Sequence, residues 1–343
     1  MIEFIFVILF FILIFLLNHY SKKKNLLTNK TGDLHQSFTS SEVVPLLGGI
    51  YLFYGFFIIF YELSLINVLL ISVFFLIGLF SDLKLIKSPN FRLVLQFIVI
   101  SIFVFYNKLE IINTRIYFLD SLLEIKYFNT LFVIFCILVI VNGSNFIDGV
   151  NTNVIGYYII ISAILIFLGF TSQLFENVDN FYIWMFICFI IYILNFFNKI
   201  YLGDSGAYFL GFIFSFFLIK LYLLNQDISP FFIVLLLWYP GFENLFSLLR
   251  KLRINRSPMK PDKNHLHQLI FLLIKSKFKI NKKKANTVSG SLINLYNLII
   301  FTISIQDIHN TQLQILLISL NVTIYSSIYV RLFRLKLGNN LGN

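Results

Sequence analysis

Long apolar runs separated by short polar breaks make up most of the chain, and this pattern predicts membrane-spanning helices. A spanning helix needs about 20 mostly apolar residues, and strands of a transmembrane barrel would alternate instead. We therefore expect an all-α polytopic membrane protein, a bundle of about eleven transmembrane helices forming one integral membrane domain over residues 1–343. The runs lie near residues 2–18, 44–60, 65–80, 92–106, 128–142, 154–170, 181–197, 206–224, 230–249, 288–306 and 312–332.

The first run follows Met1 directly and has neither a basic leader nor a small-residue cleavage site. We expect it to be a retained helix and not a signal peptide.

Composition agrees with this class, and the charges orient the bundle. Hydrophobic residues are 58% of the chain, charged residues 13%, and the mean hydropathy is +0.85. If the N-terminus lies outside, 23 of the 27 Lys and Arg residues fall on one side of the membrane. Short basic loops stay in the cytoplasm, so we expect an external N-terminus and a cytoplasmic C-terminus. The net charge of +11 is then explained by orientation and anionic lipids and not by nucleic acid.

The segment from Asn198 to Ala207 places a carboxylate between glycines where an apolar run resumes. Asp204 would lie in the first turn of a spanning helix, whose unpaired amides and dipole favour an anion. A carboxylate beside them can hold Mg²⁺ against that anion. The alternative is that Asp204 only caps the helix.

Two other acids lie at or within the apolar runs. Asp82 ends the third run, where a carboxylate is costly unless it is paired or hydrated, so it is a candidate functional residue. The structural alternative pairs it with Lys84 or Arg92. Glu243 lies inside a run, and the sequence suggests no partner for it.

The segment from Asn142 to Thr152 joins two runs without any Lys or Arg, and it contains Asn145, Asp148 and Asn151. Amide and carboxylate groups suit a uracil edge, a ribose hydroxyl or a metal, whereas a plain turn needs only one Asn-Gly or Asp-Gly. We favour a functional role. For the glycine pair after Pro45, at positions 48 and 49, we favour close helix packing over ligand binding.

The long basic segment after Arg250 contains His265 and His267. Residues at i and i+2 do not face each other on a helix, but in an extended or turn segment both could reach one phosphate. A zinc site would need further ligands, and Asp262 is the only other candidate there. We expect phosphate binding, while orientation in the membrane alone is the simpler alternative.

In the expected topology, Asp82, the Asn145–Asn151 segment, Asp204 and the histidine pair all fall on the cytoplasmic face. Carboxylates, amides, histidines and cations then surround one water-exposed membrane surface, beside helices that can admit a lipid tail. This combination predicts phosphate transfer to or from a lipid.

The same motifs, in this order, resemble the polyprenyl-phosphate N-acetylhexosamine-1-phosphate transferases. The matching segments are Pro45–Gly49, Gly78–Arg92, Asn142–Gly156, Tyr201–Gly211 and Arg256–His267. The resemblance implies a multi-pass protein of the bacterial plasma (inner) membrane that transfers a sugar-1-phosphate from a UDP-N-acetylhexosamine to a polyprenyl phosphate such as undecaprenyl phosphate, and releases UMP. It also implies Mg²⁺, for which Mn²⁺ can substitute, and a role at the start of surface-glycan assembly. A homodimer stays open.

The resemblance also assigns roles to single residues. Asp204 matches the magnesium carboxylate and Asn145 an amide added to the metal shell, while Asp82 matches the second acid of a catalytic pair. Binding of the diphosphate is assigned to the catalytic residues His265 and His267. Substrate contacts are assigned to Asp148, Asn151, Tyr201, which would stack on uracil, and Arg256. Ser81 replaces the first acid of the pair, and the expected basic signature before the glycine pair is only loosely present.

Two other classes of function remain as alternatives. A secondary transporter would share the helical bundle, but it should show midplane charges and repeated halves. A catalytically lapsed regulatory homologue would keep the fold, and Ser81 favours it.

Overall fold

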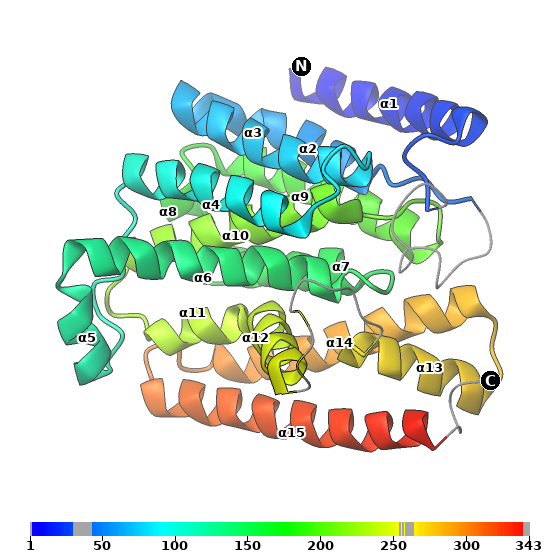
Figure 1. Cartoon of the computed structure of the whole chain (residues 1–343). Helices are drawn as coiled ribbons and strands as arrows, with labels where there is room; N and C mark the ends of the chain where they lie inside the picture. Colours follow the sequence, from blue (N-terminus) through cyan, green and yellow to red (C-terminus); the bar gives the residue numbers. More distant parts are fainter. Residues whose placement is uncertain (1, 30–42, 254, 256, 258–263, 339–343) are drawn as a thin grey trace.

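The computed structural model describes residues 2–29, 43–253, 255, 257 and 264–338, and these form a bundle of helices (Figure 1). Within these ranges the only β-type pairing is an isolated bridge between Thr28 and Pro45. The expected all-α fold class is confirmed.

The helices follow the apolar runs closely. Their bounds are α1 Ile2–Lys24, α2 Gly48–Phe56, the 3-10 helix η1 Phe57–Glu62, α3 Leu65–Asp82, α4 Pro89–Tyr106, α5 Tyr117–Leu123, α6 Lys126–Ile147, α7 Asn153–Phe167, α8 Thr171–Leu174, α9 Val178–Phe196, α10 Gly203–Leu224, α11 Pro230–Leu236, α12 Trp238–Arg253, α13 Leu266–Phe278, α14 Lys282–Ser304 and α15 Thr311–Leu337.

Among the described residues, eight helices are long and apolar enough to cross a membrane. The pair α11 and α12 forms a ninth candidate, bent by 74° at residue 237. Two shorter apolar stretches, Gly48–Glu62 and Asn153–Phe167, overlap the two remaining runs. The protein is therefore a polytopic membrane protein, and the number of spans depends on how the bent pair and the two short helices lie in the bilayer.

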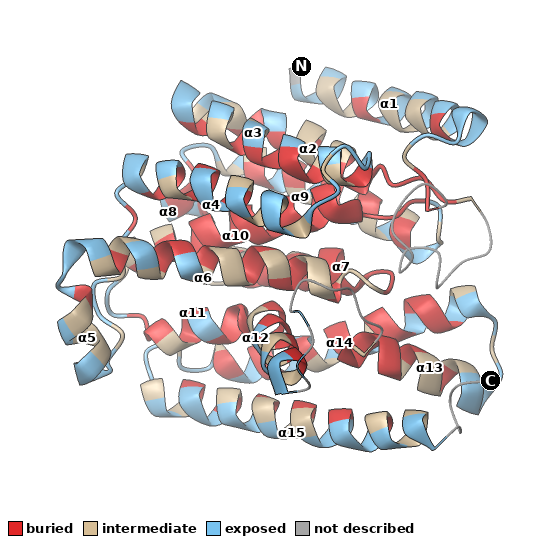
Figure 2. Cartoon of the chain, viewed as in Figure 1, coloured by how far each residue is buried: buried red, intermediate tan, exposed pale blue. Residues whose placement is uncertain are grey.

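Helix α10 lies at the centre of the bundle and α1 at its edge (Figure 1). In α10, 83% of the apolar window is buried, against 11% in α1. Helix α3 can approach the first turn of α10 closely because residue 78 is glycine: a Cβ atom added to Gly78 would lie 2.6 Å from the Ser205 Cα. Figure 2 shows the burial along α10 and the exposed outer faces of α1 and α15.

The glycine pair that begins α2 serves this packing, as expected. The Gly48 and Gly49 amides donate to the carbonyl oxygens of Tyr201 and Leu202, both at 3.0 Å. A Cβ atom on Gly49 would lie 2.2 Å from the Ser205 Oγ. The start of α2 is thus fixed against the start of α10.

Candidate active site

Asp204 lies in the first turn of α10 and is 3% exposed. Its Oδ2 accepts hydrogen bonds from the Arg92 Nη1 at 2.8 Å and from the Ser81 Oγ at 2.6 Å. The Arg92 Nη1 also donates to the Ser81 Oγ at 2.5 Å. A buried carboxylate is stable only when it is paired and hydrogen-bonded, and here the guanidinium at the start of α4 and the hydroxyl at the end of α3 meet that need.

Asp82 accepts hydrogen bonds from the backbone amides that begin α10. Its Oδ1 accepts from the Asp204 N–H at 2.8 Å, and its Oδ2 accepts from the Ser205 N–H at 3.0 Å and the Ser205 Oγ at 2.7 Å. A carboxylate at a helix N-terminus satisfies unpaired donors and the helix dipole together. Asp82 is thus an N-terminal cap supplied by another helix.

These contacts correct three expectations. Asp82 was paired with Lys84 or Arg92 in the structural alternative, but Arg92 pairs with Asp204. The unpaired amides at the start of this helix were expected to be open to an anionic ligand, but those of Asp204 and Ser205 donate to the Asp82 carboxylate. The capping alternative for Asp204 is also wrong, because the N-cap residue is Leu202 and the carboxylate that reaches the helix start is that of Asp82.

Gly203 makes this cap sterically accessible. Its φ is +76°, and a Cβ atom there would lie 2.8 Å from the Asp82 Oδ2. Only glycine adopts such a conformation without strain while letting a carboxylate approach the backbone this closely. The Gly-Asp-Ser sequence therefore has a geometric reason.

Asp148, directly after α6, adds a third carboxylate. Burial raises the pKa of Asp148 well above its ordinary value, and the charges of Asp204 and Asp82 raise it further. A hydrogen bond from the Gly203 N–H offsets part of this rise. Asp82, Asp148 and Asp204, which we call the acidic cluster, thus lie close enough to interact electrostatically.

Tyr208 connects this cluster to Asn145. The Arg92 guanidinium carbon lies 5.4 Å from the centre of the Tyr208 ring, and the Asn145 amide nitrogen donates to the Tyr208 hydroxyl at 3.0 Å. This hydrogen bond directs the Asn145 side-chain nitrogen toward α10 and leaves the side-chain oxygen as the atom that could bind a cation.

The histidine pair begins α13, where His265 precedes the helix and His267 lies in its first turn. The expected extended or turn segment is therefore wrong at His267. The two side chains are buried, their ring centres lie 5.7 Å apart, and the rings are stacked.

Glu243 is the group that orients His265. The Nδ1 of His265 lies 2.9 Å from the Glu243 Oε1, and the Tyr325 hydroxyl donates to the Glu243 Oε2 at 2.7 Å. A carboxylate on one ring nitrogen fixes the tautomer and the ring orientation. The intramembrane acid whose partner the sequence did not suggest is thus held between α13 and α15.

Residues at the end of α6 and directly after it connect the acidic cluster with the histidine pair. A Cβ atom on Gly149 would lie 2.0 Å from the His267 Nε2, so the ring packs on the backbone beside Asp148. The Phe146 ring lies 5.3 Å from the His265 ring, and the Lys251 Nζ lies 5.6 Å from the Phe146 ring centre. These motifs therefore lie together at one end of the bundle, and their position on the cytoplasmic face stays a prediction.

Two further candidate residues, Asn151 and Tyr201, have other surroundings. Asn151 is buried, its amide donates to the Asn195 carbonyl at 2.5 Å, and its backbone N–H donates to Asn286 at 2.9 Å. Tyr201 is 8% exposed and packs with Val44 and Leu46. Their contacts with uridine stay predictions, and Arg256 lies outside the described residues.

The sequence patterns drew attention to Ser81, Arg92 and Glu243 but did not place them in the site. They gave no indication of Tyr208, Lys251 or Tyr325. A buried charge needs a partner, so Glu243 indicated that a partner exists. The sequence could not identify Tyr325 as a partner, because it lies 82 residues away in the chain.

The donor atoms suit a hard cation. Carboxylate and amide oxygens from Asp204, Asp148 and Asn145 are the ligand types that Mg²⁺ prefers. Within the described part of the chain, no group of three His, Cys, Asp or Glu residues could hold a metal ion by itself. Mg²⁺ is usually bound by one or two carboxylates together with substrate phosphates, so the residues fit an ion that is completed by a diphosphate.

Comparison with known proteins relates the middle of the chain to one family. Residues 64–222 match the model of glycosyl transferase family 4. This span, which is somewhat less than half of the chain, is similar to that family. The match contains the acidic cluster, Ser81, Arg92 and Asn145, whereas Glu243 and the histidine pair lie beyond it.

A curated relative from Bacillus subtilis (strain 168) is named "Probable undecaprenyl-phosphate N-acetylglucosaminyl 1-phosphate transferase". It is 32% identical over 122 residues, an alignment that covers 30% of this chain and 33% of the relative. The aligned part thus spans about a third of the relative's length.

Proposed function

We propose that this protein transfers an N-acetylhexosamine-1-phosphate from a UDP-sugar to a polyprenyl phosphate and releases UMP. The observation that carries the proposal is that the buried acidic cluster, Arg92 and the two histidines meet at one end of an apolar bundle. The name of the Bacillus subtilis relative supports a polyprenyl acceptor.

In this reaction, an acceptor phosphate oxygen forms a bond to the sugar-bearing phosphorus of the UDP-sugar. The bond from that phosphorus to the bridging oxygen breaks, and UMP leaves with the electron pair. The products are a polyprenyl diphosphate sugar and UMP. A phosphate monoester with a second pKa of about 6 is mostly dianionic at neutral pH, so the acceptor can attack without losing a proton to the protein.

The protein's contribution is positioning and charge neutralisation. Because Asp82 already accepts the hydrogen bonds of the first amides of α10, we assign binding of the diphosphate to side chains. These are Arg92 on one side, and His265, His267 and Lys251 on the other. Bound Mg²⁺, held by Asp204 with Asn145 or Asp148, would supply charge neutralisation on the diphosphate. Glu243 keeps His265 in the orientation that directs its Nε2 away from the Glu243 carboxylate.

The test measures UMP release by purified protein with undecaprenyl phosphate, Mg²⁺ and, in separate reactions, UDP-GlcNAc, UDP-GalNAc and UDP-MurNAc-pentapeptide. We expect turnover with one donor and at least 10²-fold less in Asp204→Asn. The control is Asp179→Asn, which removes one charge from an exposed acid of α9. Absence of UMP with every donor would favour the lapsed homologue, and an Asp204→Asn protein within a few-fold of wild type would remove the metal assignment.

A further inference from the structure

A cavity of about 610 Å³ lies between α12, α13, α14 and α15. This volume is typical of a ligand pocket, for which the range is about 300–1,000 Å³. Its walls are mostly apolar and include Leu292 and Ile328, which are 49% and 40% exposed. The cavity therefore opens on the outer surface of the bundle, as a groove that lipid can enter sideways.

The length of this groove matches one leaflet. On α15 its lining extends from Ile324 to Leu335. At about 1.5 Å per residue these eleven steps cover roughly 16 Å, close to half of a hydrocarbon core of about 30 Å. The groove reaches the candidate active site, because Leu266, the neighbour of His265 at the start of α13, is part of its lining. From there α13 runs toward the side of the bundle where α15 also ends (Figure 1).

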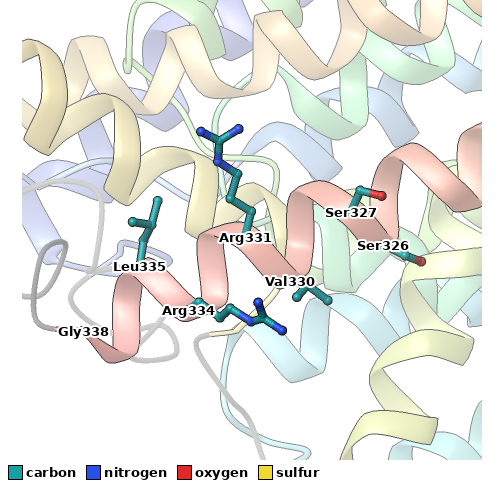
Figure 3. A pocket seen from close by; sticks show the side chains of 7 residues that line it. All are labelled: Ser326, Ser327, Val330, Arg331, Arg334, Leu335 and Gly338. Carbon is teal, nitrogen blue, oxygen red and sulfur yellow. The ribbon is translucent and has the colours of Figure 1, made fainter.

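Two cations lie among the apolar walls. Lys277, near the end of α13, and Arg331, near the end of α15, both line the groove. Figure 3 shows Arg331 extending from α15 toward the neighbouring helices, whereas Arg334 extends from another side of α15 and is not part of the groove lining. An apolar channel with two positive charges at its membrane-surface end complements a lipid with an anionic head group.

We propose that this groove binds an anionic phospholipid, with an acyl chain along α14 and α15 and the phosphate between Lys277 and Arg331. The acceptor polyprenyl phosphate is a poorer occupant. Lys277 lies twelve residues beyond His265, about 18 Å along α13, so a phosphate between the two cations is out of reach of the histidines.

The groove also touches the support of His265. Tyr325 forms part of its wall, and the Tyr325 hydroxyl donates to Glu243, which holds His265. An acyl chain in the groove packs against Tyr325 and stabilises this series of contacts. A bound phospholipid therefore increases turnover; this second part rests on the proposed function, whereas binding does not.

Binding is tested by native mass spectrometry of delipidated protein titrated with dioleoyl-phosphatidylglycerol or dioleoyl-phosphatidylcholine. We expect tighter binding of phosphatidylglycerol to the wild type and at least 10-fold weaker binding to Lys277→Gln/Arg331→Gln. The matched control, Lys275→Gln/Arg334→Gln, removes the same charge from the same two helices outside the groove lining and should bind like the wild type. Ile328→Trp, which narrows the groove without changing charge, should also weaken binding.

Equal loss in both double variants would show general surface attraction and overturn the proposal. Displacement of phosphatidylglycerol from this site by undecaprenyl phosphate, lost in the same groove variants, would make the groove an acceptor site and overturn it too. If binding holds and phosphatidylglycerol raises UMP release, both parts stand. If no protein releases UMP under any condition, the proposed function fails while the binding result is unaffected.

Discussion

Helices α10 and α13 both begin at the candidate site, but their first turns are stabilised differently. The amides of α10 are satisfied by Asp82 from α3, and the Asp204 side chain is neutralised by Arg92 from α4. At α13, the His265 N–H donates locally to the Gln268 side chain at 3.3 Å, and the His265 imidazole contacts Glu243 of α12.

The difference separates two tasks. At α10, Asp82 accepts the hydrogen bonds of the backbone donors that usually bind anions. The start of the helix therefore holds the Asp204 carboxylate in place to bind a cation. At α13, the backbone is satisfied locally and the tertiary contact orients a side chain. We therefore expect mutations at α10 to affect stability as well as turnover, and mutations behind His265 to affect turnover alone.

The largest effect should follow Asp82→Ala. It leaves three donors of Asp204 and Ser205 without their acceptor, and hydrogen bonds to charged groups are worth about 1.5–3 kcal/mol each. We expect a loss of several kcal/mol, seen as low membrane abundance and a lower Tm in fluorescence-detected size-exclusion chromatography. Asp82→Asn should recover part of the loss. The control, Glu124→Ala, alters an exposed acid, and an Asp82→Ala protein as stable as this control would contradict the cap.

Next comes Glu243→Gln, which tests orientation at α13. The substitution keeps the size of the side chain but removes the carboxylate from the His265 Nδ1, and outer-shell partners of this kind affect activity by about 10–100-fold. We expect kcat to fall in that range with KM for the UDP-sugar and Tm unchanged. Tyr325→Phe, which removes only the second hydrogen bond on Glu243, should cost less. Parallel changes in Tm and kcat would assign Glu243 to packing instead.

Asp148→Asn should stabilise the protein. The pKa of Asp148 is raised in the folded state, while an unfolded Asp titrates near 3.9. Between these values the unfolded state binds fewer protons, so folded stability falls as pH rises. Asn avoids this loss, which is about 1.4 kcal/mol per pKa unit. In chelator and without substrate, Tm of the variant should exceed the wild type at pH 7 and equal it below pH 4; a lower Tm at pH 7 would contradict the raised pKa.

The smallest effect is expected from Ser81→Asp, which restores the first acid of the resembled pair. The new carboxylate would lie beside the Asp204 Oδ2, but Arg92 contacts both positions. We expect turnover within a few-fold of wild type and half-maximal rate at a lower Mg²⁺ concentration. Ser88→Asp adds the same charge at a cap position that accepts either residue and serves as control. If Ser81→Asp activates an otherwise inactive wild type, the chain is a lapsed enzyme.

The sequence by itself determined the membrane class, the positions of the long apolar helices and the motifs that meet at one end of the bundle. These features depend on local periodicity and on the cost of burying polar groups in lipid, which any window of the sequence contains. The Gly-Asp-Ser start of α10 and the glycine pair near residue 48 were likewise visible as places of close approach.

The tertiary structure alone decided which charge pairs with which. Arg92 lies ten residues from Asp82 in the chain, yet it binds Asp204, and Asp82 binds the backbone of another helix. Glu243 gained its partners from α13 and α15. Pairing energies depend on distances of a few ångströms in a medium of low dielectric, and those distances are set by how helices far apart in sequence pack, which no local pattern encodes.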